Sequence, residues 1–381
     1  MAVEAPTLRV LTGGEAAAHA MRQIDPDVVP VYPITPQTPI IQGFAKFVAD
    51  GRASGELVDV ESEHSAMSAA VGAALAGART MTATSSQGMA LMAEVVYIAA
   101  AMRAPIVMAV GNRALSGPIN IHADHSDSML VRDSGCIQIF VENAQEAYDF
   151  MVMAPRIAEH PDVLLPVLVG QDGFTITHSA EPVAMLPDED VKGFVGEYAI
   201  PFSLLDLNVV TSQGPFAMPG EYFELRVALA HAQDAAQRVV DEVLADFAEL
   251  SGRAYEAVGS YRLDGAEHAI VLMGSSAGTV KDVVDELRVA GEAVGALEIR
   301  CFRPLPALRA ALALRDVRDV AVLDRADSPG GRAPLFAEVA GLVPNVRSHV
   351  YGLGGRDLHP EHVRAVFADE APHYVGLRTD A

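Results

Sequence analysis

Glu63 lies between a predicted strand and a predicted helix, at a position where its carboxylate could donate or accept a proton. Residues 56–66 read as a short strand, a polar turn and the start of a helix that continues to residue 78 and is rich in Ala and Gly. Ligands of open α/β sheets bind beyond the carboxyl ends of the strands, which is where this turn falls. A buried Glu among small residues needs a partner that shares its proton. On this stretch alone, a Glu that only stabilises a helix start is the favoured interpretation. Together with the neighbouring motifs, however, we expect Glu63 to be functional.

A second candidate is the proline-rich corner Tyr-Pro-Ile-Thr-Pro-Gln-Thr-Pro at residues 32–39. Pro36 suits the first position of a helix over residues 37–47, and Thr35 suits its N-cap. Capping alone would explain Thr35. However, a strand, a stiff turn and a helix N-terminus also form a rigid corner whose free N–H groups could bind an anion.

Arg113 follows a predicted strand over residues 105–110 and stands among small, flexible residues. It could form a surface ion pair of little energetic value. It could also present its planar guanidinium to the carboxylate of a ligand, which Arg does better than Lys. The next stretch contains His122, Asp124, His125 and Asp127. Metal ligation is an option for these four residues, but a hydrogen-bonded loop is the favoured interpretation.

Strands that alternate with helices must position these residues. The alternation from residue 28 to a strand over 163–170 is typical of βαβ units and a parallel sheet. A second unit begins near residue 257, so we expect two domains, 1–256 and 257–381. Residues 180–220 are punctuated by prolines without clear periodicity and read as a long excursion or interface arm. A long amphipathic helix is predicted over about residues 222–250.

Two turns could be mistaken for other features. Residues 85–88, Ser-Ser-Gln-Gly, are predicted to be a turn between a strand over 80–84 and a helix over 89–102. Residues 274–278, Gly-Ser-Ser-Ala-Gly, resemble a phosphate-binding loop but lack the Lys of a P-loop and the third Gly of the dinucleotide fingerprint. We expect the second segment to be a tight turn between a strand and a helix.

Composition excludes several classes of protein. The formal charge is 27 − 50 = −23, which argues against binding to nucleic acid or to an anionic membrane surface. No apolar run approaches the ~18–20 residues that span a bilayer, and residues 1–10 do not predict a signal peptide, so a cytoplasmic protein is expected. Cys136 and Cys301 are too far apart in sequence to predict a metal cluster or a disulfide framework. A hydrophobic content of 50% predicts surface buried against other subunits.

Six segments, in one consistent order, resemble the α subunit of 2-oxoacid:ferredoxin oxidoreductases, and the pyruvate enzyme is the nearest type. They are Tyr-Pro-Ile-Thr-Pro at 32–36, Ser-Glu at 62–63, Thr-Ser-Ser-Gln-Gly at 84–88, Arg-Ala-Leu-Ser at 113–116, Asp-His-Ser-Asp at 124–127 and Asp-Arg-Ala-Asp-Ser-Pro-Gly at 324–330. The resemblance covers nearly the whole chain. It implies an α/β fold in which a pyrimidine-type thiamine-diphosphate-binding domain with a parallel sheet precedes a smaller domain like the C-terminal domain of transketolase.

The resemblance also implies roles for single residues. Glu63 falls on the Glu that hydrogen-bonds the aminopyrimidine ring of thiamine diphosphate, where a shared proton prepares the cofactor to attack a 2-oxo carbon. Thr35 and Arg113 fall on the residues that hold the carboxylate and carbonyl end of the 2-oxoacid. The other residues expected at the cofactor are Tyr32, Pro33, Ser86 and Gln87.

The resemblance implies that thiamine diphosphate lies between this chain and a separate β subunit. The chain lacks the Gly-Asp-Gly motif and downstream Asn pair that resemble the diphosphate–magnesium grip of thiamine enzymes; Gln171-Asp172-Gly173 is nearest and departs from the pattern. We therefore expect no metal site here, Mg²⁺ on the β subunit, and [4Fe–4S] clusters on γ and ferredoxin-like δ subunits, separate or fused. Coenzyme A is the implied cosubstrate, and ferredoxin or another low-potential acceptor takes the electrons.

The expected reaction is oxidation of pyruvate to acetyl-CoA and carbon dioxide, or its reverse. Relatives that act on 2-oxoisovalerate, arylglyoxylates, 2-oxoglutarate or oxalate share the scaffold, and a pocket distinguishes one methylene by only ~1–3 kcal/mol. Two more distant alternatives are a non-oxidative thiamine enzyme and a nucleotide or acyl-CoA binding module without thiamine.

Overall fold

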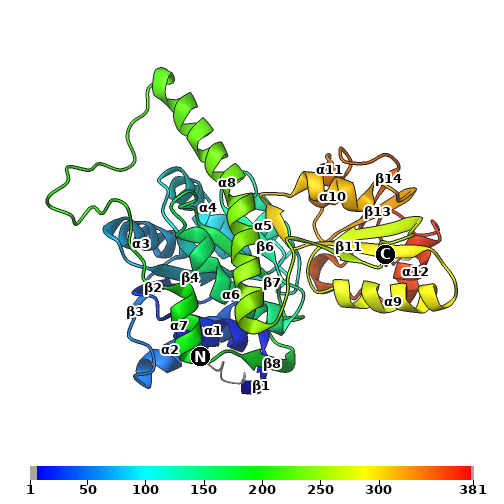
Figure 1. Cartoon of the computed structure of the whole chain (residues 1–381), viewed down its shortest axis with the longest axis horizontal. Coiled ribbons are helices and arrows are strands. Elements are labelled where there is room, and N and C mark those ends of the chain that lie inside the picture. Colours follow the sequence, from blue (N-terminus) through cyan, green and yellow to red (C-terminus); the bar gives the residue numbers. More distant parts are fainter. Residues whose placement is uncertain (1–6, 379–381) are drawn as a thin grey trace.

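The chain folds into two α/β domains that lie side by side (Figure 1). The computed structural model describes residues 7–378. The elements up to residue 251 are β1 (Thr7–Thr12), α1 (Gly13–Ile24), β2 (Val28–Val31), α2 (Thr38–Ala49), β3 (Glu56–Asp59), α3 (Glu63–Ala76), β4 (Thr80–Thr84), α4 (Ser86–Ala101), β5 (Ile106–Asn112), α5 (Ser126–Leu130), β6 (Ile137–Phe140), α6 (Ala144–Ala158), β7 (Val167–Asp172), β8 (Ala180–Met185), α7 (Asp188–Val195) and α8 (Pro219–Ser251). The later elements are β9 (Val258–Tyr261), β10 (His268–Leu272), α9 (Ala277–Val289), β11 (Val294–Ile299), β12 (Cys301–Arg303), α10 (Ala307–Leu314), β13 (Asp319–Asp324), α11 (Pro334–Val339), β14 (Val346–Val350), the 3₁₀ turn η1 (Leu353–Gly355) and α12 (Pro360–Phe367).

Seven strands form the sheet of the first domain, in the order β12-β6-β7-β5-β4-β2-β3. Neighbouring strands are parallel except for β12, which runs antiparallel to β6. Every residue of β4 to β7 is buried, as expected for a parallel sheet covered on both faces. Along β5, Val107 and Ala109 face a core formed with α1, α2 and α6, whereas Met108 and Val110 face a core formed with α3 and α4.

The two domains share a strand. Strand β12 follows β11 of the second sheet along the chain, yet its residue Cys301 pairs with Ile139 of the first sheet. Neither β6 nor β12 was predicted from the sequence, because strands of four and three residues carry almost no periodic signal. The domain boundary near residue 257 stays a prediction, since β12 lies beyond it and belongs to the first sheet.

The second domain has a five-stranded sheet in the order β14-β13-β10-β11-β9. Only β9, at one edge, is antiparallel to its neighbour. Helices α9 and α12 pack on one face, and α10 and α11 pack on the other. The predicted class, α/β with mostly parallel sheets, is confirmed.

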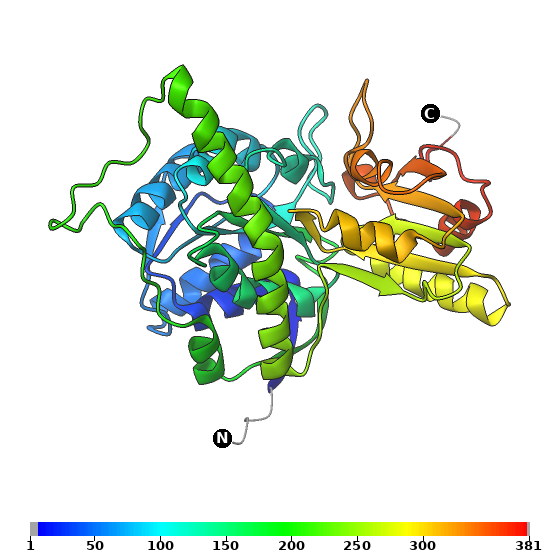
Figure 2. The ribbon, with the colours of Figure 1, turned by 45° about the horizontal axis from the view of Figure 1, so that its top comes forward.

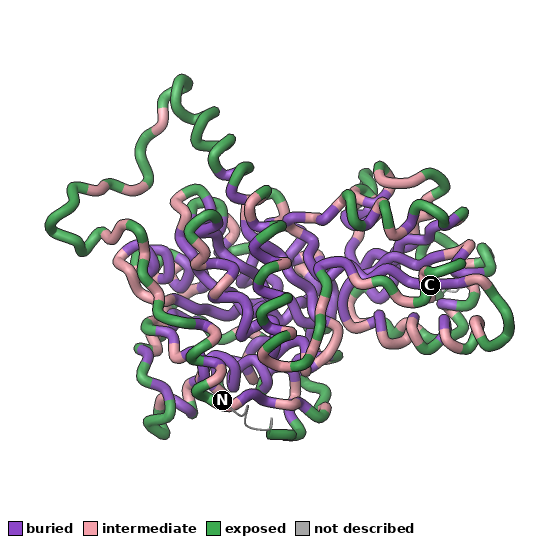
Figure 3. The backbone as a smooth tube through the Cα atoms, viewed as in Figure 1, coloured by how far each residue is buried: buried purple, intermediate pink, exposed green. Residues whose placement is uncertain are grey.

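Residues 180–220 are more ordered than predicted at their start. Strand β8 pairs with β1, with Val10 opposite Pro182, and α7 follows it. The prolines misled the prediction because an edge strand tolerates them. The excursion itself begins after α7: the chain first runs along α3, where the Leu204 N–H donates to the Leu75 carbonyl, and the residues from there to the first turns of α8 project away from the domain (Figure 2). Figure 3 shows this projecting arm, residues 197–228, as mostly exposed backbone.

Strand β7 is displaced from the predicted range, because the chain still turns after α6. Leu164 has a φ of +45°, in the left-handed region, so residues 163–165 do not continue as a strand. The predicted long helix corresponds to α8. In the described part of the chain, none of the helices combines the length and the apolar character needed to cross a bilayer.

Candidate active site

Glu63 is the first residue of α3 and is buried, with 6% of its surface exposed. The N-cap of this helix is Ser62, whose hydroxyl accepts a hydrogen bond from the Ser65 N–H at 3.2 Å. The Glu63 carboxylate faces the first turn of α4, where a Cβ added to Gly88 would lie 2.6 Å from Glu63 Oε1 and 2.4 Å from Thr84 Oγ1. A glycine is therefore required beside this carboxylate. The side chain both begins a helix and is buried, so its position fits proton sharing with a ligand.

Polar atoms without partners lie near this carboxylate. Thr84 Oγ1, Ser85 Oγ and Gln37 Oε1 are buried and make no hydrogen bond within residues 7–378. A Cβ added to Gly111 would lie 3.1 Å from Ser85 Oγ and 3.3 Å from the Gln37 backbone N atom, so both residues pack closely on Gly111. Buried polar atoms are rarely left unpaired, and a flat ring bearing nitrogen donors and acceptors would satisfy them. The residues present therefore fit an aminopyrimidine.

The proline-rich corner differs from the prediction. Helix α2 begins at Thr38 with Gln37 as its N-cap, so the interpretation of Thr35 as a cap was wrong. Gln37 closes a turn before the helix, because its N–H donates to the Ile34 carbonyl and its side-chain amide donates to the Tyr32 carbonyl at 2.9 Å. Thr35 is exposed, and its carbonyl faces Arg113.

Arg113 is 6% exposed and follows directly after β5. Its guanidinium donates to the Thr35 carbonyl at 2.9 Å and to the Asn120 carbonyl at 2.8 Å. Burial lowers the pKa of Arg113 from its ordinary value. These contacts occupy two of its five N–H donors, so the rest remain able to bind a carboxylate. The alternative of a surface ion pair was wrong.

The predicted cofactor residues divide into two groups. Ser86 is buried and begins α4, so the prediction of a turn at residues 85–88 was wrong. Its hydroxyl donates to the Ala114 carbonyl and lies 2.6 Å from Gln87 Oε1. Tyr32 and Pro33 lie at the surface, where Tyr32 is 37% exposed. Thus Ser86 and Gln87 adjoin Glu63 through Gly88, while Tyr32 and Pro33 border the corner that contacts Arg113.

Asp127, in α5, connects these groups, and sequence reasoning did not identify it as a site residue. Its Oδ2 accepts hydrogen bonds from the N–H groups of Ser86 and Arg113, each at 2.9 Å. Its Oδ1 accepts from Asn112 Nδ2 at 2.9 Å and from the Ser128 N–H at 2.7 Å. Burial raises the pKa of Asp127 to about 6, although the four donors act in the opposite direction. The loop containing Asp127 is thus hydrogen-bonded, the interpretation that the sequence favoured over metal ligation.

Asp172 joins the two domains. Its carboxylate contacts His125 Nε2 at 2.7 Å, Arg325 Nη1 at 2.6 Å and the Ser275 N–H at 2.9 Å. Although burial raises its pKa, the charges of Arg325 and His125 lower it further, so the pKa of Asp172 lies well below its ordinary value. The Gly-Ser-Ser-Ala-Gly segment is therefore a turn between β10 and α9 that docks on this carboxylate. Within Gln171-Asp172-Gly173, Asp172 therefore contacts the second domain.

One acidic group in the described residues has the spacing of a metal site: Glu142, Glu146 and Glu298. Arg300 Nη2 lies 2.8 Å from Glu146 and 2.7 Å from Glu298, so a cation from the chain already neutralises these carboxylates. Burial raises the pKa of Glu298 to about 8, even though Arg300 lowers it. The group is a buried ion network between the domains.

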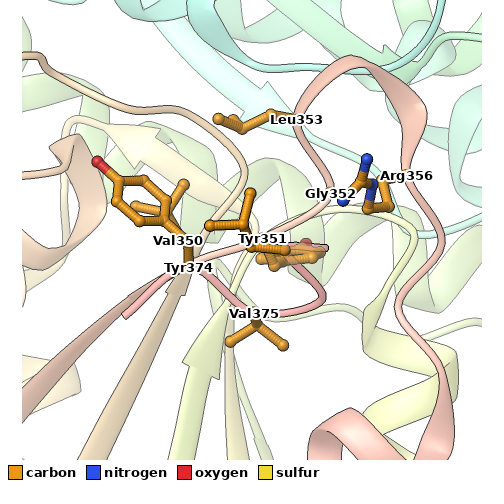
Figure 4. A pocket seen from close by; sticks show the side chains of 8 residues that line it. Val350, Tyr351, Gly352, Leu353, Arg356, Tyr374 and Val375 are labelled. Carbon is orange, nitrogen blue, oxygen red and sulfur yellow. The ribbon is translucent and has the colours of Figure 1, made fainter. Parts of the chain in front are cut away.

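Two cavities lie away from Glu63. Figure 4 shows the first, of about 200 Å³, in the second domain, with Tyr374 and Arg356 on its wall. The second, of about 610 Å³, lies between Asn120, His122 and the loop that contains η1. It adjoins the site only through Asn120, whose carbonyl holds Arg113. No predicted site residue lines either cavity.

Comparison with known proteins assigns the two domains. Residues 19–245 match the family described as pyruvate flavodoxin/ferredoxin oxidoreductase, thiamine diphosphate-binding, and residues 266–363 match pyruvate:ferredoxin oxidoreductase core domain II. The pyruvate synthase subunit PorA of Thermotoga maritima is 53% identical, over 97% of each chain. The same subunit of Methanocaldococcus jannaschii is 46% identical, over 97% of this chain and 98% of that one. The ketoisovalerate oxidoreductase subunit VorA of Pyrococcus abyssi is 40% identical, over 96% and 93% of the two chains.

Solved structures share the fold. A 2-oxoglutarate:ferredoxin oxidoreductase from Magnetococcus marinus superposes with a TM-score of 0.76 at 20% identity, over 95% of this chain and 65% of that longer one. A split-gene transketolase gives a TM-score of 0.56 at 13% identity, over 94% and 96%. The family matches cover both sheets, and the relatives align over nearly the full length. The chain therefore belongs to the pyruvate flavodoxin/ferredoxin oxidoreductase family and contains its thiamine-diphosphate-binding domain.

Proposed function

We propose that this chain is the thiamine-diphosphate subunit of an enzyme that converts pyruvate and coenzyme A to acetyl-CoA and carbon dioxide, with two electrons passed to ferredoxin, or that catalyses the reverse. The observation that carries the proposal is the buried Glu63 carboxylate at the start of α3, packed against Gly88 of α4. The relatives named pyruvate synthase support pyruvate as the substrate.

Glu63 would hold the aminopyrimidine ring by sharing a proton with a ring nitrogen. Burial favours this arrangement, because a carboxylate that is removed from water is stabilised by a hydrogen bond with a ring nitrogen. Gly88 lets the ring approach, and the unpaired hydroxyls of Thr84 and Ser85 offer it further hydrogen bonds. When bound, the cofactor supplies the carbon nucleophile and the electron sink for loss of carbon dioxide.

Arg113 and Thr35 would hold the 2-oxoacid. The free guanidinium donors of Arg113 match a carboxylate, and the two backbone carbonyls on its other edge fix its plane. Thr35, which is exposed and whose backbone carbonyl contacts Arg113, would bind the carbonyl oxygen of the oxoacid through its hydroxyl. Tyr32 and Pro33 would border the cofactor at the mouth of the site, and Ser86 and Gln87 would border it at the start of α4.

Other subunits would complete the enzyme. The chain has two cysteines, Cys136 and Cys301, both buried, whereas a [4Fe–4S] cluster needs four thiolates. The clusters would lie on γ and δ subunits, and a β subunit would bind Mg²⁺ and the diphosphate. The projecting arm is a surface for such partners, because large apolar side chains on it are 71–106% exposed: Leu205, Leu207, Val210, Phe216 and Phe223. We place the complex in the cytoplasm.

The test is an anaerobic assay of the purified complex with coenzyme A, a low-potential dye and a panel of 2-oxoacids. We expect kcat/KM for pyruvate to exceed that for 2-oxoisovalerate by about tenfold or more, since each misplaced methylene changes binding by ~1–3 kcal/mol. Preference for 2-oxoisovalerate would instead support the alternative suggested by the VorA relative. No reduction with any 2-oxoacid would contradict the proposed class of enzyme.

A further inference from the structure

Among the described residues, 7–378, Asp127 is the carboxylate that accepts hydrogen bonds from both halves of the site. It accepts a hydrogen bond from Ser86, at the start of the helix that packs on Glu63, and another from Arg113, the predicted oxoacid residue. These donors lie 41 and 14 residues away along the chain. The side chain is fully buried and lies on α5, and it links residues just beyond the carboxyl ends of the paired strands β4 and β5, next to the direct hydrogen bond from the Ser86 hydroxyl to the Ala114 carbonyl.

The backbone at Ser86 needs this contact. Ser86 has a φ of +49°, which is unfavourable for a residue with a side chain. Such a conformation persists only where its surroundings hold it, and here the N–H points at a buried carboxylate. The turn of α4 that begins at Ser86 carries Gly88, which leaves the space for the Glu63 carboxylate.

A carboxylate is required by its donors. Oδ2 faces two N–H groups and Oδ1 faces an N–H and an amide NH₂, so both oxygens must accept. An amide of the same shape would turn its own NH₂ toward one of these pairs. Leaving buried donors without an acceptor costs their desolvation free energy, so the donors on the side that meets the amide NH₂ must shift, and the four donors include the N–H groups of Ser86 and Arg113.

We propose that Asp127 is a positioning residue that aligns Arg113 with the first turn of α4, and so fixes the oxoacid relative to the cofactor-binding carboxylate. This inference rests on the proposed function. In this proposal, one buried side chain sets the distance between Arg113, which would bind the substrate, and the start of α4, which packs on Glu63. Asp127 acts through Ser86 and Arg113 and touches neither ligand.

The experiment compares Asp127→Asn with Asp124→Asn in the assembled complex. Asp124 is a matched control, because it is also buried and lies three residues before Asp127, but it accepts hydrogen bonds from the N–H groups of Ser126 and Gly354. We expect Asp127→Asn to raise the KM for pyruvate at least about tenfold, the factor that one lost hydrogen bond to a charged group corresponds to. The Kd of oxamate, measured by calorimetry, should rise in parallel, and Asp124→Asn should change both by less than about twofold.

A double-mutant cycle separates positioning from general stability. In the Arg113→Ala background, which itself raises KM, the further effect of Asp127→Asn on KM should vanish, because the group that it aligns has been removed. Unchanged KM and oxamate affinity in Asp127→Asn, or an effect of the same size in the Arg113→Ala background, would overturn the proposal.

Two controls keep the outcome interpretable. If Asp127→Asn does not assemble, Asn112→Ala removes one side-chain donor but keeps the carboxylate, and it should raise KM in the same direction by a smaller factor. An unchanged KM in Asn112→Ala would then count against the proposal. If the wild-type complex does not oxidise pyruvate, the proposed function fails; if it does and the variants behave as wild type, only the role of Asp127 fails.

Discussion

Two buried carboxylates stand on either side of the start of α4 and have opposite surroundings. Asp127 receives four N–H donors at 2.7–2.9 Å. Glu63 packs against Gly88, which also adjoins the unpaired Thr84 hydroxyl, and its oxygens accept no hydrogen bond from residues 7–378, although they are not among the fully buried polar atoms without a partner. Both are at least nine-tenths buried, so burial alone does not distinguish them.

The difference separates two kinds of buried charge. A carboxylate whose lone pairs are all used holds other groups in place, because any movement breaks several hydrogen bonds at once. A buried carboxylate without donors is unfavourable in the folded chain and is kept for a partner that brings them. Asp172 belongs with Asp127, since three groups from two domains bind it.

The largest expected effect is on turnover. Glu63→Ala should lower kcat by ~10²–10⁴-fold in the complex, the range of a lost proton-transfer group, without lowering the yield of assembled enzyme. Glu61→Ala is the matched control, because that exposed carboxylate lies two residues away and bonds Ser65. Equal losses in the two variants would remove the distinction between Glu63 and a helix-start residue.

The second prediction concerns stability. Asp172→Ala should lower the free energy of unfolding by about 3–5 kcal/mol, because it leaves Arg325 buried without its partner. Asp246→Ala breaks an ion pair in which the Asp is 51% exposed and should cost less than about 1 kcal/mol. Urea unfolding of the complex measures both, and a larger loss in Asp246→Ala would contradict the comparison.

Gly88→Ala should affect chemistry more than folding. The added methyl group would overlap Thr84 Oγ1 and Glu63 Oε1, and displacing a catalytic group by about 1 Å can lower kcat by about 10²-fold. Gly72→Ala adds a methyl group to open space on α3 and should stabilise that helix by up to about 1 kcal/mol with kcat unchanged. The measurement is kcat of the two variants by steady-state kinetics. A wild-type kcat in Gly88→Ala would show that catalysis tolerates movement of the Glu63 carboxylate.

The smallest expected effect is a pH dependence of stability. The pKa of Asp127 is raised to about 6 from 3.8, so between these values the folded chain binds a proton that the unfolded chain has lost. This contribution to stability is therefore present below pH 3.8 and is lost as the pH rises to about 6. Arg113 is the charged neighbour that the ionised form attracts. The urea midpoint of unfolding is measured for wild type and for Asp127→Asn at several pH values in this range. The wild-type midpoint minus the variant midpoint should fall as the pH rises. A difference that does not change with pH would contradict the raised pKa.

The sequence predicted best what depends on neighbouring residues. The strand predicted over 80–84 matches β4, and the strand predicted over 105–110 overlaps β5, because continuous runs of this kind between turn residues are distinctive. Glu63 and Arg113 were identified for a related reason, since each lies a few residues beyond the carboxyl end of a predicted strand, and the family resemblance then implied their roles. The α/β class was predicted from the alternation of strands and helices along the chain.

Features set by distant contacts were missed. Thr35 looked like a helix cap because its local sequence is ideal, but the Gln37 side chain closes the turn with Tyr32 and delays the helix. Asp127 accepts a hydrogen bond from Ser86, 41 residues away, and Asp172 accepts one from Arg325, 153 residues away. No local pattern encodes those pairings. The roles of the site residues stay predictions.

The central claim is that Glu63 shares its proton with the ring of thiamine diphosphate. The most direct measurement is the rate at which the C2 proton of the bound cofactor exchanges with deuterated water, followed by rapid quenching and NMR. In Glu63→Gln, which preserves the shape of the side chain, we expect exchange to slow by ~10²–10⁴-fold with the cofactor still bound. Exchange at the wild-type rate would contradict the claim.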